Sequence, residues 1–185
     1  MTCQGTLAAL AACLLSGCSL FRVSFEQDKP PESKTEVTLS VPFFPDSTDQ
    51  CGPSALASVL GYWGKPAEPR VLRQEIYQAH LKGSLAVDLL LAAGSRGLSA
   101  ELVNGSLAKI REELDSGRPL IAFVNAGYGF YPAGHYLVIT GYDDRRQRLL
   151  VHSGMKRNQE IPYGKFERQW RKTERWALLI QPLRQ

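Results

Sequence analysis

The segment DQCGPSAL at residues 49–56 constrains the fold more than any other stretch of this sequence. Gly52 and Pro53 predict a turn, and the fixed φ of proline suits a first helical position. The residues that follow, 54–62, are small or apolar, which predicts a buried helix. The sequence therefore places the Cys51 thiol at the point where a loop turns into a helix.

A cysteine in that position is a candidate nucleophile. The first N–H groups of a helix have no partner within the helix, and they lie at the positive end of the helix dipole. Both effects favour thiolate over thiol, and the thiolate is the reactive form of cysteine. Our first hypothesis is therefore a cysteine enzyme that uses Cys51.

The N-terminal residues have the pattern of a secretory leader. Residues 7–15 form an apolar run that is too short to span a bilayer, and LSGC follows at residues 15–18. This tetrapeptide resembles the lipobox of bacterial lipoproteins, which implies cleavage before Cys18 and a lipid on its thiol. We expect residues 1–17 to be the signal peptide and residues 18–36 to be the lipidated cysteine and a polar tether. Secretion with cleavage nearby is the alternative.

The same resemblance carries predictions about location and disulfides. Ser19 follows the predicted lipidated residue, and in Gram-negative lipoproteins a residue other than Asp there favours the outer membrane. We expect a lipid anchor in that membrane, facing the periplasm. Because Cys3 and Cys13 lie in the leader and Cys18 carries the lipid, Cys51 remains as the one thiol of the mature chain. A structural disulfide within that chain is not expected.

The composition suits one globular domain, which we place at residues 37–185. Of the 185 residues, 44% are hydrophobic and 22% are charged. The net charge of +4 is spread over scattered Lys and Arg residues. Because no basic stripe with interleaved aromatic residues is present, nucleic acid is not an expected partner. No cofactor or metal is expected.

Hydrophobic periodicity and turn residues divide the domain into a helical half and a strand half. Ser106 is a predicted helix cap, and Gly117 is predicted to follow the end of that helix. This order predicts an α+β fold, with N-terminal helices packed on a C-terminal antiparallel sheet. The predicted helices span residues 54–62, 69–81, 86–93, 106–114 and 166–171, and the predicted strands span residues 37–41, 100–103, 120–124, 135–142, 149–152 and 176–181.

A cysteine nucleophile needs a base, usually a histidine, and the chain has three. His80 is predicted at the end of the second helix, where a cation is common. His135 begins a long apolar strand beside a Gly-rich loop, so it can face a cleft while the strand holds it. His152 ends the return strand and can equally be a solvated edge residue. On spacing, His135 is the preferred base, and a surface loop position is its alternative.

Two motifs in this order resemble the peptidase C39 family of papain-like cysteine peptidases. They are DQCGPSAL at residues 49–56 and GHYLVITGYD at residues 134–143. The resemblance extends from about residue 37 to the C-terminus, and together with the lipobox it is strongest to a lipoprotein branch. It implies a papain-like fold, a peptide or protein substrate, Cys51 as the nucleophile and His135 as the base.

The sequence departs from the family at the expected oxyanion donor. Family members usually carry Gln five or six residues before the cysteine, where this chain has Asp46 and Pro45. An ionised Asp only accepts hydrogen bonds, so it repels an oxyanion. Gln50 is an amide nearby but is expected to point elsewhere, and the hydroxyls of residues 47 and 48 are weaker candidates.

A second departure concerns the residue that orients the histidine. The family usually has Asp or Asn just after the return strand, where this chain has Ser153. A hydroxyl can orient an imidazole but does not stabilise imidazolium as a carboxylate does. We take Ser153 as the third site residue, with Asn158 as a fallback, and expect residues 143–144 to form the hairpin turn.

These observations leave two hypotheses of different classes. The first is a cell-envelope lipoprotein that hydrolyses peptide bonds through the pair Cys51 and His135. The second is a catalytically weak or inactive papain-like domain that binds peptides or an envelope partner. The pair favours the first hypothesis, and the departures at Asp46 and Ser153 favour the second.

Overall fold

The computed structural model describes residues 34–46, 49–127 and 131–183. These residues belong to one unit, Ser33–Gln185. The predicted signal peptide, the predicted lipidation site at Cys18 and most of the predicted tether lie outside the described residues. Within the described residues, no helix is long and apolar enough to cross a membrane.

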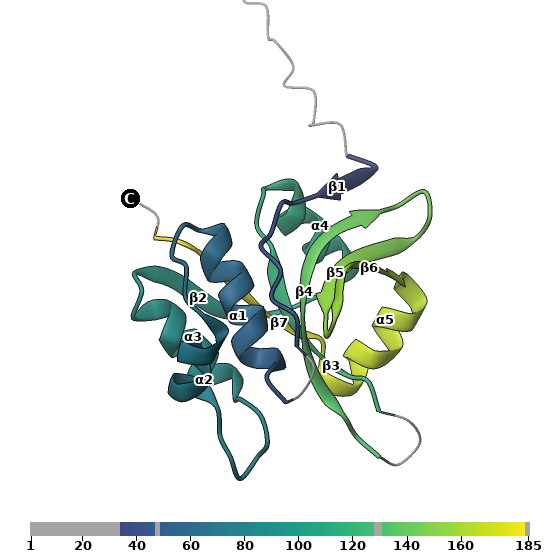
Figure 1. Ribbon diagram of the computed structural model, residues 1–185. Coiled ribbons are helices and arrows are strands. Elements are labelled where there is room, and N and C mark those ends of the chain that lie inside the picture. The colour runs from purple at the N-terminus through teal and green to yellow at the C-terminus, as the bar shows by residue number, and fades with distance from the viewer. Residues whose placement is uncertain (1–33, 47–48, 128–130, 184–185) are drawn as a thin grey trace, which may run out of the picture. The chain divides into compact units, whose positions relative to one another are not determined.

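Five α-helices and one seven-stranded antiparallel sheet form the described part of the chain, which confirms the predicted α+β class (Figure 1). Six strands lie in the order β2-β7-β3-β4-β5-β6, and β1 pairs with the C-terminal end of β4. The elements are β1 (Glu36–Thr38), α1 (Cys51–Tyr62), α2 (Pro69–Ile76), α3 (Ala86–Gly94), β2 (Leu98–Asn104), α4 (Leu107–Asp115), β3 (Leu120–Asn125), β4 (Gly134–Asp143), β5 (Arg148–Ser153), β6 (Lys156–Pro162), α5 (Tyr163–Trp170), the 3-10 helix η1 (Arg171–Thr173) and β7 (Trp176–Pro182).

The sheet is covered on both faces because its central strands are apolar on both sides. In β4, Tyr136 and Val138 pack in one buried cluster with α1, α2 and α3. The alternate residues Leu137 and Ile139 pack in a second cluster with α4 and α5. Successive side chains of a strand point to opposite faces, so one strand joins the two cores. The result is a helix–sheet–helix arrangement with α1 against β4.

The sequence predictions differ from the structure at the second helix, at His80 and at strand β6. The second helix ends at Ile76 rather than near residue 81, because Gln78 and Gly83 pair across a tight turn. His80 lies exposed in that turn instead of at a helix end. Strand β6 was not predicted, since it is a polar edge strand in which only Ile161 is buried.

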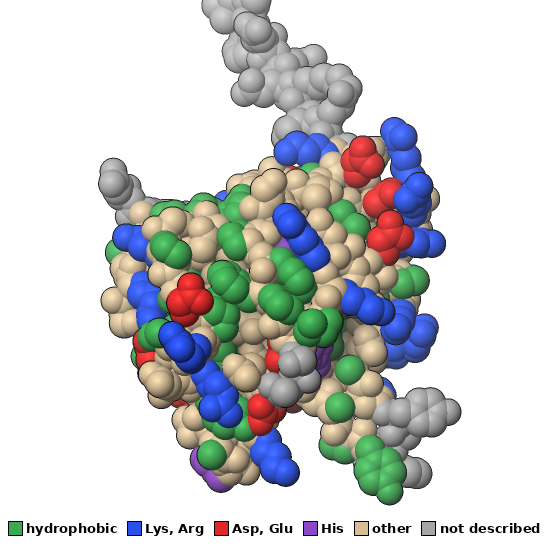
Figure 2. All heavy atoms as spheres, viewed as in Figure 1, with side chains coloured by type: hydrophobic (Ala, Val, Ile, Leu, Met, Phe, Trp, Pro, Cys, Tyr) green, Lys and Arg blue, Asp and Glu red, His purple; other side chains and the backbone are tan. Residues whose placement is uncertain are grey.

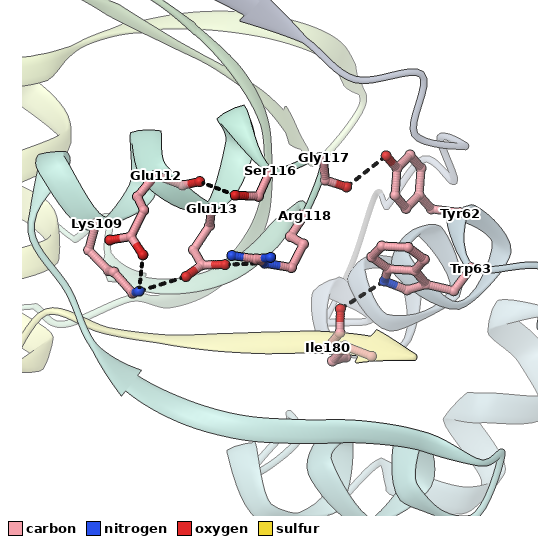
Figure 3. Close-up of polar contacts among 9 residues, drawn as sticks. All are labelled: Tyr62, Trp63, Lys109, Glu112, Glu113, Ser116, Gly117, Arg118 and Ile180. Atoms are coloured by element: carbon pink, nitrogen blue, oxygen red, sulfur yellow. Dashed lines mark hydrogen bonds and ion pairs between the residues drawn. The ribbon is translucent and has the colours of Figure 1, made fainter. Parts of the chain in front are cut away.

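The C-terminal end of α1 is tied to the rest of the fold by two aromatic side chains (Figure 3). The Tyr62 hydroxyl donates to the Gly117 carbonyl at 2.8 Å, and Trp63 Nε1 donates to the Ile180 carbonyl at 2.7 Å. These contacts reach the loop after α4 and strand β7. The first residues of α1 are buried as well, so both ends of the helix are fixed.

Candidate active site

Cys51 is the first residue of α1, and Gln50 is the N-cap. The first hydrogen bond of the helix runs from the Ser54 N–H to the Gln50 carbonyl at 3.0 Å. Pro53 is thus the third helical residue rather than the first, which its missing N–H permits because that N–H has no helical acceptor. Cys51 is the free cysteine of the described residues, and its side chain is half-buried.

The surroundings of the thiol oppose the expected thiolate. Burial raises the pKa of Cys51, while backbone hydrogen bonds from Tyr136, Gly52 and Cys51 itself lower it, and the Asp46 charge raises it further. The net pKa lies above the ordinary value. The helix N-terminus therefore acts as predicted, but desolvation outweighs it.

His135 is the second residue of β4, where it pairs with Val124 of β3. Pairing between β4 and β5 begins at Val138, so residues 134–137 extend past β5. Cys51 packs against the buried cluster that contains Tyr136, and both residues line one pocket, so the thiol lies beside this extension of β4. Gly134 is required there, because a Cβ on it would lie 2.5 Å from the Phe123 ring.

Ser153 is the contact that orients the histidine ring. It is the last residue of β5, and its Oγ lies 2.9 Å from His135 Nε2. This contact engages Nε2 of the ring and not the other ring nitrogen, Nδ1. Burial lowers the pKa of His135, and the Asp46 charge opposes that shift without cancelling it. The pKa directions of Cys51 and His135 together favour a neutral thiol and a neutral imidazole over an ion pair.

Asp46 is held at the entrance to the helix. Its N–H donates to the Gly154 carbonyl at 3.0 Å, and its Oδ1 accepts from the Gln50 N–H at 3.3 Å. Only 9% of the residue is exposed. The departure noted in the sequence is thus a buried acid whose charge acts on both Cys51 and His135.

A small pocket adjoins the thiol between α1 and the strands. Figure 2 shows hydrophobic and charged side chains intermixed on the face that carries α1 and α3. The pocket combines buried hydroxyls and the Asp46 carboxyl with apolar walls. Its lining residues are Phe43, Phe44, Asp46, Cys51, Ser54, Ala55, Ser58, Tyr136, Val138, His152, Ser153 and Gly154.

The other candidates have structural partners. His152 is buried, its Nδ1 accepts from the Asn158 N–H at 3.2 Å, and its Nε2 therefore donates to the Val41 carbonyl at 3.0 Å. Asn158 contacts His152 and Thr140 rather than His135. Asp144 accepts from Arg111 and Tyr163 at the hairpin turn. No group of residues suited to hold a metal ion occurs among the described positions.

Sequence reasoning missed the loop that leads into α3. Ser84 packs against the start of α1, since a Cβ on Gly52 would lie 3.0 Å from its Oγ. The Ser84 carbonyl also accepts from the Tyr136 hydroxyl at 3.1 Å. This loop therefore joins the nucleophile's helix to the histidine's strand. The ring of Tyr136 packs in the core while its hydroxyl bonds to Ser84, and no local sequence pattern predicts this combination.

A helix that begins at a cysteine and packs on an antiparallel sheet carrying a histidine is the arrangement of papain-like cysteine peptidases. The chain belongs to the Peptidase_C39 like family, which it matches over residues 30–178. A search of curated proteins finds no match.

Solved structures of this class share the fold. A double glycine motif protease from an AMS/PCAT transporter, solved with the leader peptide, has a TM-score of 0.64 and 23% identity, over 80% of this chain and 95% of that one. A C39-like peptidase from Bacillus anthracis has a TM-score of 0.65 and 18% identity, over 82% and 100%. Xylellain, a cysteine protease from Xylella fastidiosa, has a TM-score of 0.60 and 13% identity, over 82% and 87%.

Proposed function

We propose that this protein is a lipoprotein of the bacterial cell envelope that hydrolyses peptide bonds with Cys51 as the nucleophile and His135 as the base. The observation that carries the proposal is the placement of Cys51 as the first residue of α1, which packs on β4, the strand whose His135 Nε2 lies 2.9 Å from Ser153 Oγ. The leader peptide bound to the double glycine motif protease supports a peptide substrate.

The mechanism follows from the protonation states. Because the thiol and imidazole are favoured in their neutral forms, Nδ1 of His135 takes the Cys51 proton as the sulfur attacks the carbonyl carbon. The oxyanion that forms lies near the Cys51 N–H, which supplies one donor. The imidazolium then gives its proton to the leaving amine, and water hydrolyses the thioester. Ser153 keeps the ring oriented through both proton transfers.

The test of catalysis uses residues 19–185 and a peptide vinyl sulfone, which alkylates a poised thiol. Wild type should label much faster than His135→Ala, and Cys51→Ala should not label. His80→Ala is the matched control, because His80 is an exposed turn residue. Equal labelling of wild type and His135→Ala would contradict a working pair.

The lipoprotein part of the proposal has its own test. The full chain, expressed in a Gram-negative host with an alkyne-bearing palmitate, should acquire the label and sediment with the outer membrane. Cys18→Ser should lose the label, whereas Cys51→Ser should keep it. Label that persists in Cys18→Ser, or a released wild type, would overturn the anchor.

Binding without hydrolysis is the second candidate, and a specific observation favours it. The raised pKa of Cys51 and the lowered pKa of His135 both weaken the pair. The expected signature is a peptide ligand that binds wild type and Cys51→Ala with equal affinity and is recovered intact from wild type.

A further inference from the structure

We propose that Tyr77 is a positioning residue of the candidate active site: its hydroxyl holds the Asp49 carboxylate at the end of α2 and keeps that charge away from the Cys51 thiol. The inference rests on the proposed peptidase function, because Cys51 is the nucleophile of that function, and it deepens it. Its consequence is that the reactivity of Cys51 depends on a hydrogen bond between two residues outside the lining of the pocket beside the thiol.

The contact between Tyr77 and Asp49 joins the end of α2 to the segment of chain that enters α1. Helix α2 packs beside α1 (Figure 1). Tyr77 follows the last residue of α2, and its N–H donates to the Arg73 carbonyl at 3.1 Å. Its hydroxyl donates to Asp49 Oδ2, and Asp49 lies one residue before the N-cap of α1. Because both side chains are partly buried, this hydrogen bond fixes the direction of the carboxylate.

Arg73 brings a positive charge to the same hydrogen bond. Its guanidinium carbon lies 4.1 Å from the centre of the Tyr77 ring, which is a cation–π contact. The hydrogen bond and the charge of Asp49 raise the pKa of Tyr77, and Arg73 opposes that shift in part. The Asp49 carboxylate is thus bound to a hydroxyl that a cation of α2 also contacts.

An Asp49 carboxylate without this partner would act on the thiol. Two residues of chain span at most about 7 Å, so the backbone of Asp49 stays close to Cys51. The N–H groups at the start of α1 attract a carboxylate that has lost its other donor. Asp46 lines the pocket beside the thiol, and its charge already raises the pKa of Cys51. A second carboxylate there would lower the thiolate fraction further.

The residue that follows in the chain, Gln78, restrains another acid near the site. Its Nε2 donates at 3.2 Å to Oδ2 of Asp88, in the first turn of α3. Burial raises the pKa of Tyr136, and the charges of Cys51 and Asp88 raise it further, so Asp88 faces the strand that carries His135. Two consecutive residues after α2 therefore each hold a carboxylate in a fixed direction near the candidate site.

The test measures how fast iodoacetamide alkylates Cys51 at pH 8. It uses the full chain in detergent, and mass spectrometry of the peptide that contains Cys51 reads the rate. Tyr77→Phe should react about tenfold more slowly than wild type, which is the effect of raising a thiol pKa by about one unit. Tyr62→Phe is the matched control and should stay near the wild-type rate, because the Tyr62 hydroxyl anchors the other end of α1 to a backbone carbonyl.

The amide of residue 49 separates the effect of charge from the effect of anchoring. Asp49→Asn keeps a side-chain oxygen that accepts from Tyr77 but carries no charge. This variant should be alkylated at least as fast as wild type. Adding Tyr77→Phe to Asp49→Asn should then change the rate by no more than about twofold, because no carboxylate is left to be released.

Three outcomes would overturn the role of Tyr77. They are a wild-type rate in Tyr77→Phe, an equal loss in Tyr77→Phe with and without Asp49→Asn, and an Asp49→Asn variant as slow as Tyr77→Phe. Iodoacetamide alkylation forms no acyl-enzyme, so these rates do not depend on peptide hydrolysis. If they are as expected while His135→Ala labels with the vinyl sulfone as fast as wild type, the role of Tyr77 stands and the peptidase proposal fails.

Discussion

His135 Nε2 and Ser153 Oγ lie 2.9 Å apart, so a hydroxyl rather than a carboxylate orients the candidate base. The hydroxyl fixes the ring but adds no charge, and the burial that lowers the pKa of His135 is opposed only in part, by Asp46. The missing charge suggests a direct way to strengthen the pair.

Ser153→Asp should raise the pKa of His135, because an opposite charge within hydrogen-bond distance favours imidazolium, typically by about 1–3 units. Proton NMR of the imidazole reports that pKa directly. The rate of Cys51 alkylation at neutral pH should increase as the ion pair with imidazolium becomes accessible. Ser153→Asn, which has the same shape without the charge, should leave the pKa of His135 near the wild-type value. Equal shifts in the two variants would show that sterics, not charge, control the base.

Gly134→Ala should impair the site more than the fold. A methyl group there would lie 2.5 Å from the Phe123 ring, so the strand must move at the residue before His135. We expect at least tenfold slower alkylation of Cys51, since small displacements of catalytic groups are costly. The free energy of unfolding, measured by thermal unfolding with circular dichroism, should decrease by about 1–3 kcal/mol, as is usual for overpacking. The combined change Gly134→Ala with Phe123→Leu should recover part of the rate.

The fold was largely predictable because its strongest signals are local. The long apolar run at residues 135–142 indicates a buried strand, and Ser106 does cap α4, since its Oγ accepts from the Lys109 N–H at 3.0 Å. Strand β6 was missed because its pairing with β5, rather than any apolar pattern, defines it. The early end of α2 likewise depends on the cross-turn pairing of Gln78 and Gly83, which propensity does not reveal.

The contact between His135 and Ser153 was predictable from the sequence, whereas the electrostatics of the candidate site were not. The order of motifs placed Cys51, His135 and Ser153, and the structure brings Ser153 to the histidine. The pKa of the thiol depends on how completely the surrounding layers exclude water, and that is a property of packing. For the same reason, the sequence showed that Asp46 stands where the family has a donor, but it did not reveal the burial of Asp46 beside both reactive groups.

Acid should destabilise the folded protein through its buried histidines. Burial lowers the pKa of His152, and likewise that of His135, below the ordinary value of 6.5. The unfolded chain therefore binds more protons below about pH 6.5, so the free energy of unfolding falls as the pH falls, by at most about 1.4 kcal/mol per unit for each histidine. Urea unfolding between about pH 7.5 and 5 measures this slope. His152→Gln should flatten it, whereas His80→Gln, a change at an exposed turn, should not.

The buried carboxylate of Glu113 in α4 leads to a prediction that concerns stability alone. Glu113 is 2% exposed; burial would raise its pKa, but hydrogen bonds from Arg118 and Lys109 outweigh burial and hold the pKa below the ordinary value (Figure 3). Arg118→Met should cost about 2–3 kcal/mol, less than the roughly 3–5 of a fully orphaned buried charge, because Lys109 Nζ remains 2.8 Å from Glu113. The double variant Glu113→Leu with Arg118→Met should recover most of that loss, since no buried charge is left unpaired. A double variant that is less stable than Arg118→Met would show that the ion pair itself, rather than the penalty of an orphaned charge, stabilises this part of the fold.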